Sequence, residues 1–140
     1  MADIAPILCI EKECPLISHW SDESYKAVFA ADAPERILLV AQNENGLQGF
    51  IVARITVDEC DLENIAVASS YRRNGIGSRL ARSLIDVTRR QGVRRIHLEV
   101  RESNAPARAF YGRLGFSQTG VRKSYYSEPS EDAVLYVLTV

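Results

Sequence analysis

The segment Tyr71–Arg90, YRRNGIGSRLARSLIDVTRR, joins a glycine-containing turn to an amphipathic helical pattern. Its apolar residues Ile76, Leu80 and Leu84 follow i, i+4 spacing, which places them on one face of a helix. Arginines occupy the opposite face, and Gly92 is a natural C-terminal stop. The pattern therefore predicts a helix that packs against a sheet.

The turn before this helix has the chemistry of an anion-binding site. A helix start exposes unpaired backbone N–H groups and the positive end of the macrodipole, and glycines let a ligand approach closely. The turn Arg72–Gly77, RRNGIG, therefore suits a pyrophosphate, although an ordinary helix cap would use the same residues. It is not a P-loop, because no Lys-Ser or Lys-Thr pair follows Gly77. It is not a Rossmann fingerprint either, because Leu80 stands where the third glycine is required.

The segments around the helix indicate a mixed α/β fold. Strand patterns occupy ERILLVAQ (35–42), LQGFIVARITVD (47–58), CDLENIAVA (60–68), VRRIHLEVR (93–101), SQTGVRKSYY (117–126) and AVLYVLTV (133–140), with a further possible strand at 7–10. Further helices are expected over 18–32 and 103–116, the second ending at Gly115. This order predicts one domain over 1–140, with a sheet that carries helices on both faces.

Composition limits the class of protein. The 140 residues are 46% hydrophobic, which is enough for one compact domain with a real core. The N-terminal segment lacks the pattern of a signal peptide, and no stretch approaches the roughly 18 apolar residues of a membrane span. We therefore expect a cytoplasmic protein without membrane contact. Cys9, Cys14 and Cys60 fit neither a metal-binding CxxC pattern nor a disulfide framework, so reduced thiols and no metal are expected.

The net charge of −1 conceals a strong asymmetry. The stretch 72–123 contains 13 basic and three acidic residues, whereas the remainder contains four basic and 15 acidic residues. A basic half of this kind can attract a polyphosphate or a nucleic acid. Direct nucleic-acid binding is not expected, because the basic residues are not interleaved with aromatic ones. A solvated helix face accounts for Arg79, Arg82, Arg89 and Arg90.

Three segments together resemble the GNAT superfamily of acyl-CoA-dependent N-acetyltransferases: NIAVASSYRRNGIGSRLARSLID (64–86), LEVRESNAPARAFYGRLGF (98–116) and VRKSYY (121–126). More narrowly, the chain is similar to the RimI-type enzymes that acetylate the N-terminal α-amine of a ribosomal protein. The resemblance runs from about Leu62 to the C-terminus, and HWSDESY (19–25) resembles a further family feature. It implies the GNAT fold, with a mostly antiparallel sheet whose middle strands splay apart, and acetyl-CoA as the acetyl donor.

The resemblance assigns the helix start and the preceding strand edge to coenzyme A. Backbone N–H groups of the turn would hold the pyrophosphate, and the strand edge would bind the pantetheine arm as if it were another strand. In this interpretation the Val67 N–H polarises the thioester carbonyl, whereas Asn104 could equally serve only as a helix cap. The residues implied in cofactor binding are Ile65, Ala66, Val67, Arg72, Arg73, Asn74, Gly75, Ile76, Gly77, Ser78, Asn104 and Tyr111.

Acetyl transfer needs a base for the attacking amine and an acid for the departing thiolate. By resemblance, Glu99 is the base, acting through a water, and Tyr111 is the acid. Glu63 is an alternative base, at a position where the RimI pattern usually has an apolar residue. His97 shares the strand face of Glu99 and could relay a proton. The simpler alternatives are a salt bridge of Glu99 with Arg101 or Arg95, and helix packing of Tyr111 beside Phe110.

Aromatic residues are implied in binding the acceptor. Tyr125 and Tyr126 match an aromatic pair that covers the peptide site in the family. Trp20 would form the opposite wall, and Glu63 is grouped with these residues as part of the substrate site. We therefore expect the acceptor to lie between the last strands and the first helix.

The expected acceptor is a protein N-terminus. An α-amine has a reference pKa near ~8, against about 10.4 for a lysine side chain, so it is far easier to deprotonate at neutral pH. Glu128, Glu131 and Asp132 could attract a cationic peptide, although a simply solvated acidic loop is the alternative. A small-molecule amine or a lysine side chain is the alternative acceptor, and a non-catalytic acyl-CoA-binding module is the alternative function. We expect a monomer or a weak homodimer.

Overall fold

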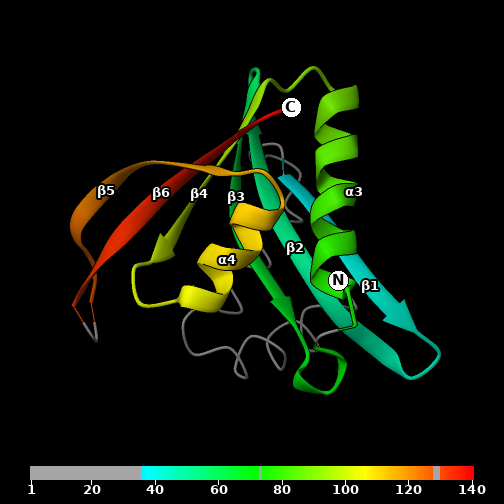
Figure 1. The fold of residues 1–140 in the computed structure, drawn as a ribbon. Coiled ribbons are helices and arrows are strands. Elements are labelled where there is room, and N and C mark those ends of the chain that lie inside the picture. The colour runs from blue at the N-terminus through cyan, green and yellow to red at the C-terminus, as the bar shows by residue number, and fades with distance from the viewer. Residues whose placement is uncertain (1–35, 73, 128–129) are drawn as a thin grey trace.

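The computed structural model describes residues 36–72, 74–127 and 130–140, which form a six-stranded sheet and two α-helices (Figure 1). The elements are β1 (Arg36–Asn43), β2 (Gly46–Thr56), β3 (Glu59–Val67), the 3₁₀ turn η1 (Ser69–Tyr71), α3 (Ile76–Arg90), β4 (Arg95–Arg101), α4 (Ala105–Arg113), β5 (Ser117–Tyr126) and β6 (Glu131–Thr139). The strand expected at 7–10 and the helix expected over 18–32 lie outside the described residues.

The sheet has the strand order β1-β2-β3-β4-β6-β5. All neighbouring strands pair antiparallel except β3 and β4, which are parallel. A parallel pair needs a long crossover connection, and α3 supplies it between these two strands. The predicted mixed, mostly antiparallel sheet is therefore confirmed.

The two central strands separate soon after they begin. β3 and β4 pair only where Glu59–Asp61 lies beside Arg95–His97. Beyond these residues β3 stays paired with β2, and β4 stays paired with β6. Figure 1 shows the two strands diverging from their paired ends. The predicted splay in the middle of the sheet is confirmed.

A bulge in β3 accompanies this separation. Val52 pairs with Asn64, but the next residue of β2, Ala53, pairs with Leu62, so Glu63 is the extra residue. Such an insertion bends a strand and changes which of its side chains face the core. Leu62 belongs to the core, and after the bulge Ile65 and Val67 pack against the same core. Before the bulge the even-numbered residues Cys60 and Leu62 therefore face this core, whereas after it the odd-numbered residues Ile65 and Val67 do.

The described helices pack against one common core. Ile76, Leu80 and Leu84 of α3 are buried against strand residues such as Ile51 and Ile96, which confirms the predicted apolar stripe. Tyr111 of α4 enters the same cluster, so α3 and α4 cover the same face of the sheet. The helix expected for the other face falls in the segment 18–32, outside the described residues. Neither described helix combines the length and hydrophobicity needed to cross a bilayer.

The tip of the β2–β3 hairpin contains a strained residue. Val57 has a φ of 57° and its exposed fraction is 91%. A β-branched residue rarely adopts this left-handed conformation, and burial does not compensate for the strain here. Asn tolerates positive φ far better than Val.

We therefore expect Val57→Asn to raise the free energy of unfolding by about 1 kcal/mol, measured by urea denaturation. Val121→Asn is the matched control, because Val121 is an exposed valine on β5 without a positive φ. Val121→Asn should not stabilise the protein. Equal or lower stability of Val57→Asn relative to the parent would contradict the strained hairpin tip.

Candidate functional site

A cleft of about 590 Å³ opens where β3 and β4 separate, and the starts of α3 and α4 border it. We call it the helix-side cleft. Ten of the residues that the resemblance assigns to coenzyme A line it: Ile65, Ala66, Val67, Arg72, Gly75, Ile76, Gly77, Ser78, Asn104 and Tyr111. Asn74 is not part of the lining, and Arg73 lies outside the described residues. The structure therefore gathers most of the predicted cofactor residues around one cavity.

The edge of β3 presents backbone groups to this cleft. Ala68 N–H donates to the Gln48 carbonyl of β2 over 2.8 Å, whereas the Val67 carbonyl accepts from Arg72 Nε over 3.1 Å. Backbone groups of successive strand residues point to opposite edges. Ile65 and Val67 therefore direct their N–H and C=O groups away from β2, toward the gap between β3 and β4. An extended ligand could pair with this edge as an added strand.

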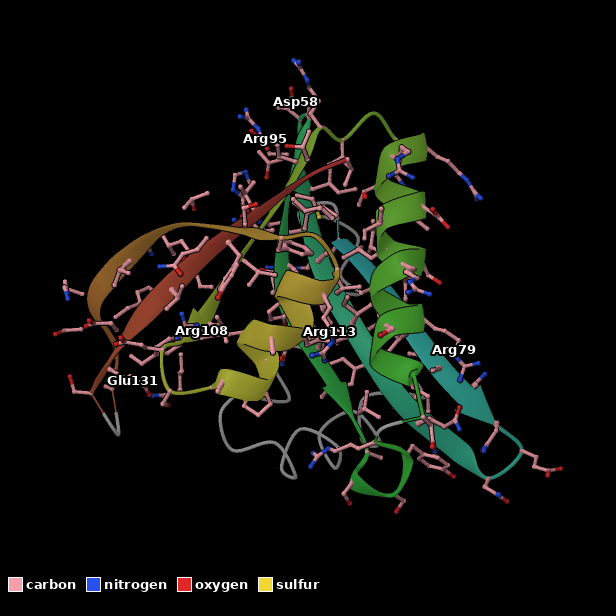
Figure 2. The ribbon with its side chains drawn as sticks, in the orientation of Figure 1. Asp58, Arg79, Arg95, Arg108, Arg113 and Glu131 are labelled. Carbon is pink, nitrogen blue, oxygen red and sulfur yellow. The ribbon has the colours of Figure 1, made fainter. Side chains whose placement is uncertain are left out.

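The start of α3 completes one end of the helix-side cleft. Gly75, the N-cap residue, has a φ of 76°, a left-handed conformation that glycine adopts without strain. Within the described residues, no side chain caps this helix start and its first turn carries no acidic residue. The positive end of the helix is thus not neutralised locally, as an anion site requires. Figure 2 shows Arg113 between α4 and α3, whereas Arg79 projects from the outer side of α3.

Tyr111 reaches the cleft from the core. The centroid of its ring lies 5.3 Å from that of the Phe110 ring and 5.7 Å from that of the Phe116 ring, and both contacts are edge-to-face. Burial raises the pKa of the Tyr111 hydroxyl well above its usual value, so the phenol stays neutral at physiological pH. The neutral phenol is the form that can donate a proton. Tyr111 therefore packs in the hydrophobic core and also lines the helix-side cleft, so the structural and the functional interpretation are compatible.

A second cleft of about 660 Å³ adjoins the first and is bordered by β5. We call it the β5-side cleft. The predicted substrate residues Glu63, Tyr125 and Tyr126 line it, whereas Trp20 lies outside the described residues. Among the described residues, five line both clefts: Leu62, Glu63, Leu98, Glu99 and Tyr126. The two clefts thus meet at the splay, beside both candidate bases, Glu63 and Glu99.

The two candidate bases differ in their partners. Arg36 Nε and Nη2 bind the two carboxylate oxygens of Glu63 over 2.8 and 3.3 Å, and both side chains are more than four-fifths buried. Glu99 Oε1 lies 3.3 Å from Arg122 Nη1, whose side chain is 54% exposed. A hydrogen bond to Glu99 raises the pKa of the Tyr125 hydroxyl. Glu63 is therefore held by a buried two-point ion pair, whereas Glu99 has a looser, more exposed partner.

The His97 side chain is directed to a different carboxylate. Its Nε2 lies 3.0 Å from Glu59 Oε2, and Arg95 Nη2 lies 2.8 Å from the other oxygen of Glu59. The hydrogen bond with His97 is the main cause that lowers the pKa of Glu59. The structure thus places His97 in an ion-pair cluster at the paired end of β3 and β4. These contacts do not join His97 to Glu99 as the predicted proton relay would.

The acidic residues at the start of β6 do not form an open acidic surface. Glu131 binds Arg101 and the backbone N–H of Ser103, whereas Asp132 binds Lys123 and the backbone N–H of Ser124. These hydrogen bonds lower the pKa of both carboxyl groups. Local groups thus already bind both carboxylates, and Glu128 lies outside the described residues, so the attraction of a cationic peptide stays a prediction.

Sequence reasoning missed the arginines that organise the site. Arg36 and Arg122 contact the candidate bases, and Arg101 lies over the Tyr126 ring at 4.4 Å from its centroid. Each lies on a different strand from its partner, so no local spacing links them. For Arg101 the sequence did contain a signal: the alternation of β4 places it on the same polar face as Glu99, and therefore near the candidate site.

Comparisons with known proteins agree with this geometry. Residues 4–116 match the acetyltransferase (GNAT) family. The chain is 38% identical over 124 residues to the [ribosomal protein bS18]-alanine N-acetyltransferase of Escherichia coli K12, covering 86% of this chain and 81% of that protein. It is 40% identical over 105 residues to the Haemophilus influenzae enzyme of the same name, covering 72% of this chain and 71% of that protein.

Solved structures show the same fold. The ribosomal-protein-S18-alanine N-acetyltransferase from Escherichia coli superposes with a TM-score of 0.89 at 30% identity, covering 100% of this chain and 89% of that one. An acetyltransferase from Bacillus anthracis, solved in complex with acetyl coenzyme A, superposes with a TM-score of 0.72 at 26% identity, covering 80% of this chain and 66% of that one. The chain therefore belongs to the GNAT family and is an acetyl-CoA-dependent N-acetyltransferase.

Proposed function

We propose that this enzyme acetylates the N-terminal α-amine of a protein. In this proposal acetyl-CoA occupies the helix-side cleft and the acceptor peptide occupies the β5-side cleft. The observation that carries the proposal is the meeting of the two clefts at Glu99 and Tyr126. The names of the relatives support an N-terminal alanine of a ribosomal protein as the acceptor.

The residues of the helix-side cleft fit coenzyme A. The first backbone N–H groups of α3 would hold the pyrophosphate, and the outward backbone groups of Ile65 together with the Val67 N–H would hold the pantetheine arm and its thioester. Bound acetyl-CoA supplies the activated acetyl group. The Val67 N–H would stabilise negative charge on the carbonyl oxygen as the amine attacks. Asn104 caps α4 by accepting from Ala107 N–H over 3.2 Å, so this side chain is already held at the rim of the cleft.

The proposed acid and base both line the clefts: Tyr111 lines the helix-side cleft, and Glu99 lines both clefts. Glu99 would take the proton of the attacking amine through a water, and neutral Tyr111 would protonate the departing thiolate. Glu63 is the weaker candidate base, because the two-point ion pair with Arg36 would have to loosen before it accepted a proton. An α-amine suits this arrangement, since its reference pKa near ~8 leaves a substantial neutral fraction.

Mass spectrometry of a peptide mixture tests the proposed acceptor. Peptides that begin with Ala, Ser, Gly, Thr or Met would be incubated with acetyl-CoA and the enzyme, together with lysine peptides and small amines. We expect acetylation at α-amines, fastest for Ala, and none on the same peptides with blocked N-termini. Acetylation of lysine side chains or small amines alone would overturn the proposed acceptor.

A pair of substitutions distinguishes the two candidate bases. Glu99→Gln should lower kcat by about 100-fold, because it removes the proposed base while keeping the shape of the side chain. Glu63→Gln should lower kcat much less and should mainly reduce stability, because it breaks the ion pair with Arg36. Steady-state kinetics at saturating peptide measure both effects. A larger loss of kcat for Glu63→Gln would assign the base to Glu63 instead.

Gly49 determines how closely β2 approaches the proposed cofactor edge. It pairs with Val67, and a Cβ atom at this position would lie only 2.8 Å from the Ala66 carbonyl oxygen and 3.3 Å from the Val67 Cα. Both are backbone atoms, so they can yield only if the end of β3 moves. A methyl group here would therefore displace the peptide units that we assign to the pantetheine arm.

We expect Gly49→Ala to weaken coenzyme A binding by about tenfold, measured by isothermal titration calorimetry. Gly112→Ala is the matched control, because a Cβ at Gly112 meets no atom within 4 Å and alanine favours the α4 helix. The control should bind coenzyme A like the parent. Unchanged binding by a folded Gly49→Ala variant would count against the β3 edge as the cofactor site.

A further inference from the structure

Tyr126 occupies the junction of the two clefts, and its position depends on neighbours in other elements. It is the last residue of β5 and lines both clefts. Burial raises the pKa of its hydroxyl to about 12, so the side chain is neutral. A tyrosine at the end of an edge strand is not held by the sheet alone. Its side-chain contacts therefore help to decide where the ring lies; one is an edge-to-face contact with the Tyr125 ring, 5.1 Å between centroids, and the others come from different segments.

Arg101, the last residue of β4, contacts the Tyr126 ring and also donates from Nη2 to the backbone carbonyl of Ser127 over 3.4 Å. Its guanidinium carbon lies 4.4 Å from the centroid of the Tyr126 ring, within the range of a cation–π interaction. Arg101 Nη1 also lies 3.4 Å from Glu131 Oε1, and the two side chains are only 11% and 15% exposed. A planar guanidinium can stack on a ring and bind a carboxylate at the same time, which an ammonium group cannot do as well.

Glu131 extends this contact to the start of α4. Its second carboxylate oxygen accepts a hydrogen bond from the Ser103 backbone N–H. Ser103 directly precedes Asn104, the N-cap of α4, and Asn104 lines the helix-side cleft. Figure 2 shows Glu131 at the end of the sheet opposite Asp58 and Arg95. Glu131 thus links the β5–β6 end of the sheet to the β4–α4 connection.

We propose that Arg101 and Glu131 form a clamp that fixes the Tyr126 ring at the junction of the clefts, which makes Arg101 a positioning residue for acetyl transfer. The proposal rests on the assignment of the β5-side cleft to the acceptor. Arg101 acts through Tyr126, so it affects how the acceptor amine is held next to the acetyl group. It does not take part in proton transfer.

A double-mutant cycle tests the clamp. The variants are Arg101→Gln, Tyr126→Ala and the double substitution, and kcat and KM are measured separately for the acceptor peptide and for acetyl-CoA. We expect Arg101→Gln to lower kcat/KM for the peptide by about tenfold, while KM for acetyl-CoA stays within about twofold. In the Tyr126→Ala background, Arg101→Gln should change kcat/KM by less than about twofold, because its target ring is gone. If the fold-losses of kcat/KM in the two single variants multiply in the double variant, the two residues act independently and the proposal is overturned.

Further variants separate positioning from a general loss of stability. Arg101→Lys keeps the charge but loses the planar stack, so it should lose most of the peptide kcat/KM although it folds. Glu131→Gln should produce a smaller loss with the same dependence on Tyr126. Arg94→Gln is the control, because the Arg94 side chain is 77% exposed and pairs with Asp58 at 4.0 Å. Full activity of folded Arg101→Lys would also contradict the clamp.

The experiments test the proposed acceptor and the proposed clamp separately. If the parent enzyme acetylates small amines and no peptide α-amine, the proposed acceptor fails. The cycle is then measured with the amine that is acetylated, and additive effects of Arg101 and Tyr126 would still reject the clamp. Coupled effects with that amine would support the clamp while the acceptor is reassigned.

Discussion

The separation of β3 from β4 is the constraint on which the rest of the structure depends. The two strands share only three paired positions before each follows its other neighbour. A strand edge in the middle of a sheet directs N–H and C=O groups away from any neighbouring strand, and such groups are costly to bury unless something binds them. The fold therefore maintains an edge that an extended amide chain can satisfy. The pantetheine arm of coenzyme A is such a chain. The helix-side cleft runs from the start of α3 to this edge of β3.

Ion pairs between strands maintain the polar face of the sheet around this gap. Four carboxylates in or beside the β5-side cleft each pair with an arginine: Glu59 with Arg95, Asp61 with Arg54, Glu63 with Arg36, and Glu99 with Arg122. The Glu63 pair is nearly buried, so it fixes the bulge against β1. The Glu99 pair is more exposed, and exposed pairs contribute little to stability. A water or an amine can therefore compete for the Glu99 carboxylate more easily than for Glu63.

The features that follow from local spacing could be predicted from the sequence. The apolar stripe from Ile76 to Thr88 specified α3, and the alternation of 93–101 specified β4 with Glu99 on its polar face. The bulge at Glu63 was not predicted, because one extra residue in a strand leaves no signal in its alternation. The partners of Glu63 and Glu99 depend on strand order, which brings together residues more than 20 positions apart in the sequence. The clamp on Tyr126 has the same cause, because it joins the ends of three strands.

Amide hydrogen exchange measured residue by residue by NMR tests most directly whether the open edge of β3 holds the acetyl donor. The outward N–H groups of Ile65 and Val67 should exchange more slowly when coenzyme A is added. The Ala68 N–H, which already binds the Gln48 carbonyl, should change little and serves as an internal reference. This alternating pattern is the predicted result. Binding of coenzyme A without slower exchange at Ile65 and Val67 would contradict the account, because the ligand would then not pair with this strand.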